Sequence, residues 1–119
     1  MERAVPVIPG DDIRAMKEFY VDKLGFELIW ENPSEDNSTD GMIGVRRGGI
    51  AITIDCPMSG HGRRACVSLE VDDADAYYDE WKDKVEMKRP PMNEYWGGRT
   101  FGVHDPADNT IFVIGPVTA

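Results

Sequence analysis

The sequence has few cysteines, no long apolar run and fewer basic than acidic residues. Its two cysteines, Cys56 and Cys66, are too few for a disulfide framework in a chain of 119 residues. No stretch approaches the roughly 18 uninterrupted apolar residues that a membrane helix requires. The first residues show neither the basic segment nor the apolar run of a signal peptide. We therefore expect a cytoplasmic protein with free thiols and no membrane partner.

The shortage of basic residues limits the partners that the chain can attract. There are 13 Lys and Arg against 22 Asp and Glu, a formal net charge of −9. A field of this sign repels phosphate backbones and raises the local concentration of cations, so we expect no nucleic-acid partner. Net charge also keeps proteins soluble, so this charge does not identify a ligand by itself.

An internal repeat divides the chain into two halves. A shift of 61 positions places the acidic pair at 11–12 on the pair at 72–73, with further matching residues after it. The length suits one domain, and a repeat of this size indicates a duplicated structural unit within it. We predict one domain of two modules, covering about residues 1–57 and 63–119.

Each half shows the pattern of a strand, a helix and three further strands. A branched apolar run, 4–9 or 65–71, precedes the acidic pair, whose carboxylates suit the first turn of a helix. Apolar residues at helical spacing predict a first helix over about 12–24, ended by Gly25, and a weaker second one over 76–85. The remaining strands are predicted over the following segments: 26–31, 41–45, 49–55, 85–88, 99–104 and 110–114. The expected fold is therefore α+β, with the order βαβββ twice.

Four short runs carry a resemblance to a known family. They are 4–8 with 19–26 in the first half, and 96–99 with 104–109 in the second. Together they resemble the glyoxalase/bleomycin resistance protein/dioxygenase superfamily, also called vicinal oxygen chelate, and most of all its bleomycin-resistance branch. The resemblance covers nearly the whole chain. It implies tandem βαβββ modules that form a curved mixed sheet around a cavity, and a homodimer in which the first strand crosses to the partner.

The resemblance also implies four positions for metal ligands, and this chain has lost most of them. The enzymes of the superfamily use His and Glu, whereas the corresponding positions here are Val5, Ala51, Cys66 and Phe112. One thiol among three residues that cannot coordinate is too few for zinc or iron. We therefore expect no metal, no cofactor and no catalytic residue.

Strand alternation then selects the residues that would line the cavity. Cys66, Ser68 and Glu70 share one face of their strand, and Thr110, Phe112 and Ile114 share one face of theirs. In the resembled proteins the face with the former metal positions lines the cavity. The predicted ligand-binding residues are Trp30, Asp55, Ser68, Glu70, Tyr95, Trp96 and Phe112.

Aromatic faces beside carboxylates favour a planar, cationic ligand, held by stacking and cation–π attraction. We accordingly predict metal-free sequestration of a bleomycin-type antibiotic in an acidic, aromatic crevice. Trp30 and Trp96 are equally compatible with a buried core. An acidic run, composed of Glu31, Glu35, Asp36 and Asp40, is either a solvated loop or the flank of the crevice mouth.

Two other functions stay open. A divergent lyase or dioxygenase of the same superfamily could use relocated ligands such as Cys66, His104 and a carboxylate, and a stoichiometric bound metal would favour it. A sensor or accessory domain is the third possibility. The other histidine, His61, lies in a glycine-flanked loop and is expected to be a solvated side chain.

Overall fold

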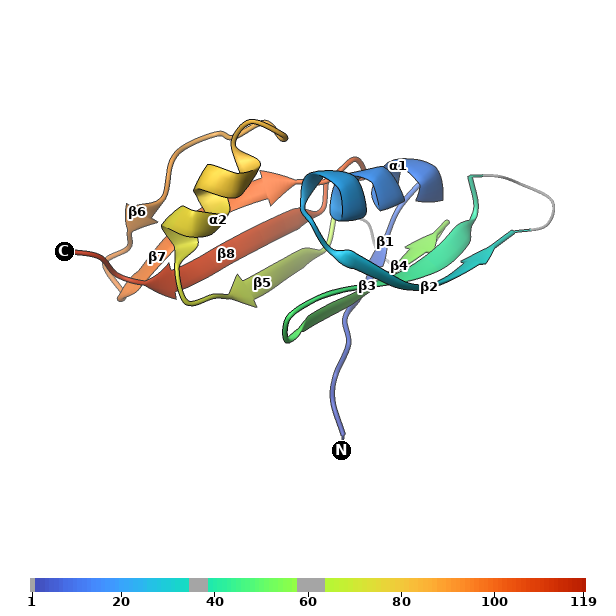
Figure 1. The fold of residues 1–119 in the computed structure, drawn as a ribbon, viewed down its shortest axis with the longest axis horizontal. Helices are drawn as coiled ribbons and strands as arrows, with labels where there is room; N and C mark the ends of the chain where they lie inside the picture. The colour runs from blue at the N-terminus through green and yellow to red at the C-terminus, as the bar shows by residue number, and fades with distance from the viewer. Residues whose placement is uncertain (1, 35–38, 58–63) are drawn as a thin grey trace.

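The computed structural model describes residues 2–34, 39–57 and 64–119. Its elements repeat one order twice, as the sequence predicts (Figure 1). In chain order they are β1 (Val7–Pro9), α1 (Ile13–Lys17), the π-helix η1 (Glu18–Lys23), β2 (Glu27–Pro33), β3 (Gly41–Arg47), β4 (Ile50–Cys56), β5 (Cys66–Glu70), α2 (Ala74–Trp81), β6 (Met92–Asn93), β7 (Gly98–His104) and β8 (Thr110–Pro116). No helix in these ranges is long and apolar enough to cross a membrane.

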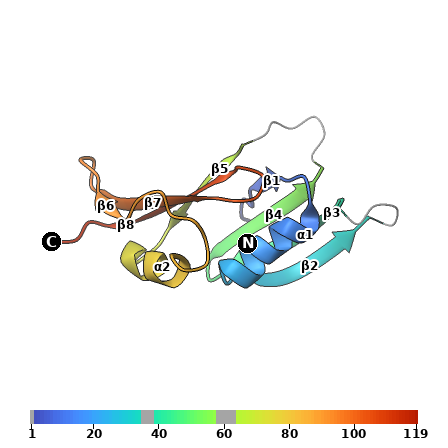
Figure 2. The ribbon, with the colours of Figure 1, turned by 90° about the horizontal axis from the view of Figure 1, so that it is seen from above.

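The strands form two four-stranded mixed sheets of the same topology. Their orders are β1-β4-β3-β2 and β5-β8-β7-β6. In each sheet the first pair is parallel and the other two are antiparallel, which confirms the predicted duplication. The sheets lie side by side along the long axis of a molecule of 53 × 35 × 25 Å (Figure 2). The radius of gyration is 14.7 Å, above the roughly 13.5 Å of a compact chain of this length.

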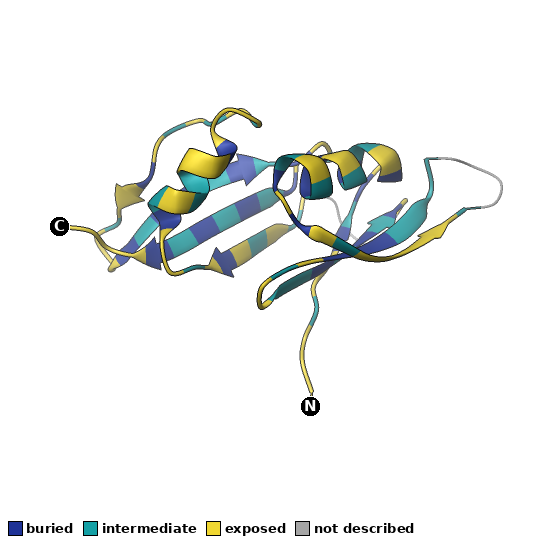
Figure 3. Ribbon diagram, viewed as in Figure 1, coloured by how far each residue is buried: buried dark blue, intermediate teal, exposed yellow. Residues whose placement is uncertain are grey.

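The helices cover only one face of these sheets. Both helices lie on the same side, and buried and less buried residues alternate along the strands (Figures 1 and 3). Ile52 and Ile54 of β4, like Ile111 and Val113 of β8, point to the helices and are buried. The residues between them point the other way and are half-buried. We call this second side, which carries Thr53, Asp55, Thr110 and Phe112, the helix-free face.

The acidic pairs cap the helices, as predicted. In each pair the second residue is the N-cap: Asp12 accepts from the Arg14 amide at 3.0 Å, and Asp73 accepts from the Ala76 amide at 3.1 Å. Each carboxylate satisfies an amide that the first turn leaves without a partner. The two caps stand 61 residues apart, at the interval of the repeat.

The first helix has the predicted extent but a different second half. From Glu18 it widens into a π-helix, in which the Leu24 amide donates to the Phe19 carbonyl at 2.9 Å, and Gly25 follows with a φ of 76°. The Leu24 carbonyl accepts from Trp81 Nε1 at 3.1 Å and from Arg47 Nη1 at 2.8 Å. The helix end is therefore shaped by partners that are remote in sequence.

The predicted strand at 85–88 is wrong, and the first strand is shorter than predicted. The amides of Lys84 and Val85 both donate to the Trp81 carbonyl, so this segment ends the helix and has no ladder to join. The strand that pairs with β7 is the two-residue β6. At the N-terminus only Val7–Pro9 forms β1, and the residues before it project from the body (Figure 1).

A buried polar network joins the two modules. Tyr20 Oη donates to Asp105 Oδ2 at 2.7 Å, and Asn109 Nδ2 donates to the same oxygen at 2.9 Å and to the Pro9 carbonyl at 2.7 Å. Asp105 Oδ1 accepts from the amides of Ala107 and Asn109. Burial, and then the Asp105 carboxylate, raise the pKa of Tyr20 well above its ordinary value, so the hydroxyl stays a proton donor.

We expect Tyr20→Phe to lower the free energy of unfolding by about 1–3 kcal/mol, because a buried carboxylate loses a donor without gaining another. Urea denaturation at neutral pH measures the change. Tyr95→Phe is the matched control, since Tyr95 is fully exposed and should leave stability unchanged. Equal stability of the two variants would show that the network does not hold the modules together.

Candidate ligand-binding crevice

The helix-free face collects most of the residues that the sequence predicts for binding. On the second sheet, Ser68 lies in register with Phe112, and Glu70 with Ile114. On the first sheet, Asp55 lies at the far end of β4, beside Pro9 of β1. The strand alternation inferred from the sequence therefore places these side chains on the expected side.

Trp30 is a surface residue on the helix-free face. A β-bulge between Leu28 and Trp30 shifts the register, so that Trp30 pairs with Gly44 of β3. The indole lies directly over Gly44, and any Cβ at that position would collide with it. With 40% of its surface exposed, Trp30 is available to a ligand and is not a core residue.

Trp96 repeats this arrangement on the second sheet. It lies in a tight turn between β6 and β7. The backbone N–H of Glu94 donates to the Gly98 carbonyl at 2.7 Å and closes this turn, and Gly97 within it has a φ of 103°. Its ring covers Gly98, where a Cβ would collide with it. Trp96 is 51% exposed and the neighbouring Tyr95 is fully exposed.

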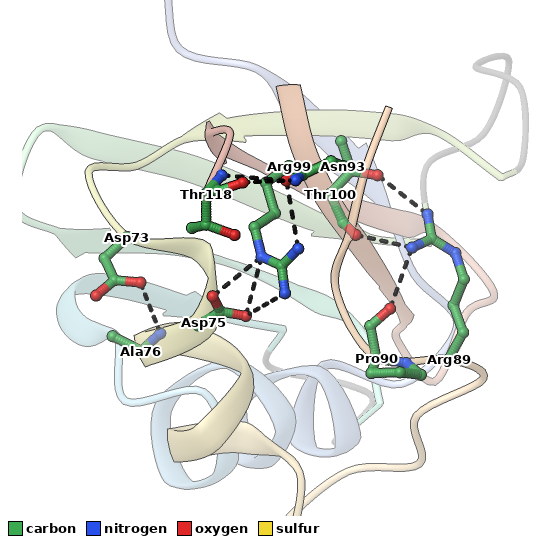
Figure 4. A network of polar contacts seen from close by, with 9 residues as sticks. All are labelled: Asp73, Asp75, Ala76, Arg89, Pro90, Asn93, Arg99, Thr100 and Thr118. Carbon is green, nitrogen blue, oxygen red and sulfur yellow. Dashed lines mark hydrogen bonds and ion pairs between the residues drawn. The ribbon is translucent and has the colours of Figure 1, made fainter. Parts of the chain in front are cut away.

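Polar contacts anchor the strands that carry this turn (Figure 4). Arg99 of β7 forms a two-pronged ion pair with Asp75 of α2. Its Nε donates to Oδ2 at 3.0 Å, and its Nη2 donates to Oδ1 at 3.1 Å. Asn93 Nδ2 donates to the Thr118 carbonyl at 2.8 Å, and Asn93 Oδ1 accepts from the backbone N–H of Thr118 at 3.2 Å. Such support fixes a binding side chain before the ligand arrives and reduces the entropy lost on binding.

Thr100 adds a second anchor beside the turn. Arg89 donates to the Thr100 carbonyl at 2.8 Å and to its Oγ1 at 3.0 Å (Figure 4). Thr100 Oγ1 donates in turn to Glu94 Oε1 at 3.0 Å. The first residue of the turn is therefore tied to the middle of β7.

A cleft of about 670 Å³ separates β4 from β5. Ser68, Glu70 and Asp72 of the second module line it, together with Tyr77 of α2 and Arg47 of β3. Arg47 is already paired with Glu80, at 2.6 and 2.7 Å, and stacks 4.5 Å from the Tyr77 ring. This hydrogen bonding raises the pKa of Arg47 and lowers that of Glu80. The carboxylates of Glu70 and Asp72 thus make part of the cleft lining acidic.

The predicted residues do not meet within one chain. Trp30 and Asp55 belong to the first sheet, whereas the other five belong to the second sheet or its β6–β7 turn. The sheets stand side by side, so their helix-free faces do not oppose each other (Figure 2). Within a single copy the candidate residues are therefore divided between two separate faces.

One residue of the acidic run, Glu31, lies on the helix side of the first sheet and does not flank the helix-free face. Glu31 points to the helix side and pairs with Lys17 of α1 at 3.0 Å. Glu35 and Asp36 lie outside the described residues, as does His61. Residue alternation on β2 explains the difference, because Glu31 follows Trp30 and must face the opposite way.

The positions that correspond to metal ligands in the resembled enzymes carry no set of metal-coordinating side chains in this chain. Ala51 and Phe112 are strand residues on the helix-free face, and Cys66 is exposed. His104 Nδ1 lies 3.5 Å from Thr110 Oγ1 and 3.4 Å from Asp108 Oδ1. Within the described ranges, no group of three or more His, Cys, Asp or Glu could hold a metal ion.

Comparison with known proteins places this geometry in context. Residues 4–113 match the family model described as the Glyoxalase/Bleomycin resistance protein/Dioxygenase superfamily. A bleomycin-binding protein from Streptomyces verticillus, crystallised with copper(II)-bleomycin, is 30% identical, with a TM-score of 0.75 over 98% of each chain. No curated protein sequence matches this chain.

Two other solved structures share the fold at lower identity. A bleomycin resistance determinant encoded on the transposon Tn5 is 19% identical, with a TM-score of 0.81 over 99% of this chain and 100% of its own. An antibiotic binding protein from Streptomyces sp. CB03234 is 23% identical, with a TM-score of 0.76 over 98% of each chain.

We expect protein purified without chelators to contain no stoichiometric transition metal, because Val5, Ala51 and Phe112 offer no lone pair at the former ligand positions. Elemental analysis checks the content, and melting with and without EDTA checks whether any metal supports the fold. About one equivalent of zinc, nickel, manganese or iron retained through purification would contradict the expectation and favour a divergent enzyme.

Proposed function

Because the chain belongs to the glyoxalase/bleomycin resistance protein/dioxygenase superfamily, we propose that it binds and sequesters a planar, cationic antibiotic of the bleomycin type without altering it. One observation carries this proposal: two exposed tryptophans, each laid over a glycine, stand on the helix-free face of the two sheets. Large rings held flat and open to solvent suit stacking on a planar ligand. Such protection by stoichiometric binding needs no turnover, and we place it in the cytoplasm.

The charge of the cleft supports a cationic ligand. Glu70 and Asp72 line it, and its arginine is already neutralised by Glu80. A cation over an indole gains electrostatic attraction from the ring, and nearby carboxylates add a complementary field. The net charge of −9 draws cations toward the protein in the same sense.

We further propose that the working form is a homodimer with an exchanged N-terminal segment. Trp30 and Trp96 lie on sheets that do not face each other, so a complete aromatic crevice requires the first sheet of one copy and the second sheet of another. The residues before β1 project from the body, where they could reach a partner (Figure 1). Two equivalent crevices would then form about a twofold axis.

Trp30→Ala and Trp96→Ala should each weaken bleomycin binding by about 1–3 kcal/mol with little change in salt dependence, because they remove contact area at the centre of the site. Glu70→Gln should weaken binding mainly at low salt, where screening is slight. Titration calorimetry at two ionic strengths measures both effects. The aromatic assignment fails if both tryptophan variants remain folded and bind as tightly as the parent.

The dimer can be tested with the same variants. The full chain should sediment as a dimer at micromolar concentration, and removal of residues 1–6 should yield monomers or insoluble chains, because these residues would tie the copies together. Mixing refolded Trp30→Ala and Trp96→Ala chains should restore tight binding in about a quarter of the sites, since half of the dimers are mixed and each has one intact crevice. A well-folded full-length monomer, or mixing without recovery, would refute the shared crevice.

A further inference from the structure

A second, smaller hollow opens on the helix-free face of the first sheet. Its volume is about 130 Å³, and Trp30, Gly44, Arg46, Ala51, Thr53 and Arg3 contribute to its lining. A closed apolar cavity of about 150 Å³ is known to hold one benzene molecule. The hollow therefore has the size of a single aromatic ring, placed against the Trp30 indole.

The charge of this hollow is opposite to that of the protein as a whole. Arg46 lines it, and none of its described lining residues is acidic. Arg3 also lies on the lining, but it belongs to the segment proposed to reach the partner and carries no part of the argument. The facing acid, Glu27, lies 3.9 Å from Arg46, and both side chains are half or more exposed. An ion pair so long and so exposed contributes little, so the guanidinium is left able to bind an anion.

A guanidinium beside a ring-sized hollow suits one chemical group in particular. Its planar fork matches the two oxygens of a carboxylate, which it can bind through parallel hydrogen bonds. Thr53 supplies a hydroxyl on the same lining. A carboxylate or sulfonate attached to an aromatic ring would meet the arginine and the indole together.

We propose that this hollow is a subsite for an aromatic acid: it holds a ring of the ligand against Trp30 and the acidic group on that ring against Arg46. The inference rests on the proposed sequestering function and adds to it, because a ligand that spans both sheets would carry a cation toward Glu70 and an acid toward Arg46. Solvent ions screen distant charges beyond about 10 Å at 0.1 M salt. The local guanidinium of Arg46 therefore decides the preference despite the net charge of −9.

Ala51 makes the hollow possible. It pairs with Arg46 across β3 and β4 and contributes only a methyl group to the lining. A larger side chain at this position would occupy the space intended for the ring. Ala51→Phe therefore blocks the subsite while it leaves Arg46 and Trp30 in place.

The test uses three probes of nearly equal size and different charge: benzoate, benzamide and benzylamine, the last as its cation. Full-length, ¹⁵N-labelled protein in 0.1 M salt is titrated, and the indole N–H signal of Trp30, assigned with Trp30→Phe, reports binding. We expect benzoate to bind at least about 5-fold more tightly than benzamide, and benzylamine most weakly. Arg46→Gln should abolish the preference for benzoate, and Ala51→Phe should abolish binding of all three. Arg14→Gln is the control, since it removes the same charge from the helix side of the same sheet.

The inference is overturned if benzoate up to about 10 mM leaves the Trp30 signal unmoved, a range that would detect even millimolar affinity. It is also overturned if the three probes bind equally, if benzylamine binds most tightly, or if Arg46→Gln keeps the preference. Bleomycin binding is measured in parallel. Bleomycin bound without a preference for benzoate would refute this subsite alone, whereas the preference without bleomycin binding would refute the proposed ligand alone.

Discussion

Each module has one helix with which to cover a four-stranded sheet, and the rest of the structure follows from this constraint. One face of each sheet is buried under its helix, with Ile52, Ile54, Ile111 and Val113 packed beneath. The other face must meet solvent, a ligand or a second copy. The modules stand side by side, joined by the buried hydrogen bond of Tyr20 to Asp105, so the two open faces do not oppose each other. The open faces are the part of the fold that is free to bind.

The local features of the fold follow from the sequence, since they depend on neighbours in the chain. Asp12 and Asp73 cap the helices because a carboxylate at that position meets the free amides of the first turn, and alternation alone orients Ser68 and Glu70. The end of the first helix depends on Trp81 and Arg47, which are remote in sequence and donate to the Leu24 carbonyl. The strand predicted at 85–88 is replaced by the two-residue β6, whose pairing with β7 is likewise a property of the folded chain. No periodic pattern contains that information.

The sequence predicts which face of each sheet the candidate residues occupy, but it does not predict how those residues are arranged in space. Strand alternation puts the candidates on the correct side, yet the exposure of Trp30 depends on a bulge that brings Gly44 under its ring. Nothing in the segment around Trp30 specifies a glycine 14 positions later as its partner. The division of the candidates between two sheets is likewise a property of the packed chain. Each tryptophan lies over a glycine, and this pairing is a signal in the sequence. Once the strand register is known, it distinguishes a tryptophan that lies on the surface of the sheet from one that is buried in the core.

The two modules differ in the residues that they carry at matching positions of the helix-free face, where a ligand would bind. Ala51 and Phe112 stand at matching positions of the repeat, and their partners across the ladder are Arg46 and Gly102. One module therefore combines a small residue with a cation, which leaves a hollow, whereas the other combines a large ring with a glycine, which fills the same place. A site assembled from two identical half-sites would favour a symmetric ligand. The crevice proposed above would join two faces that differ in shape and in charge. It would therefore discriminate between the two ends of its ligand and fix the ligand's direction as well as its position.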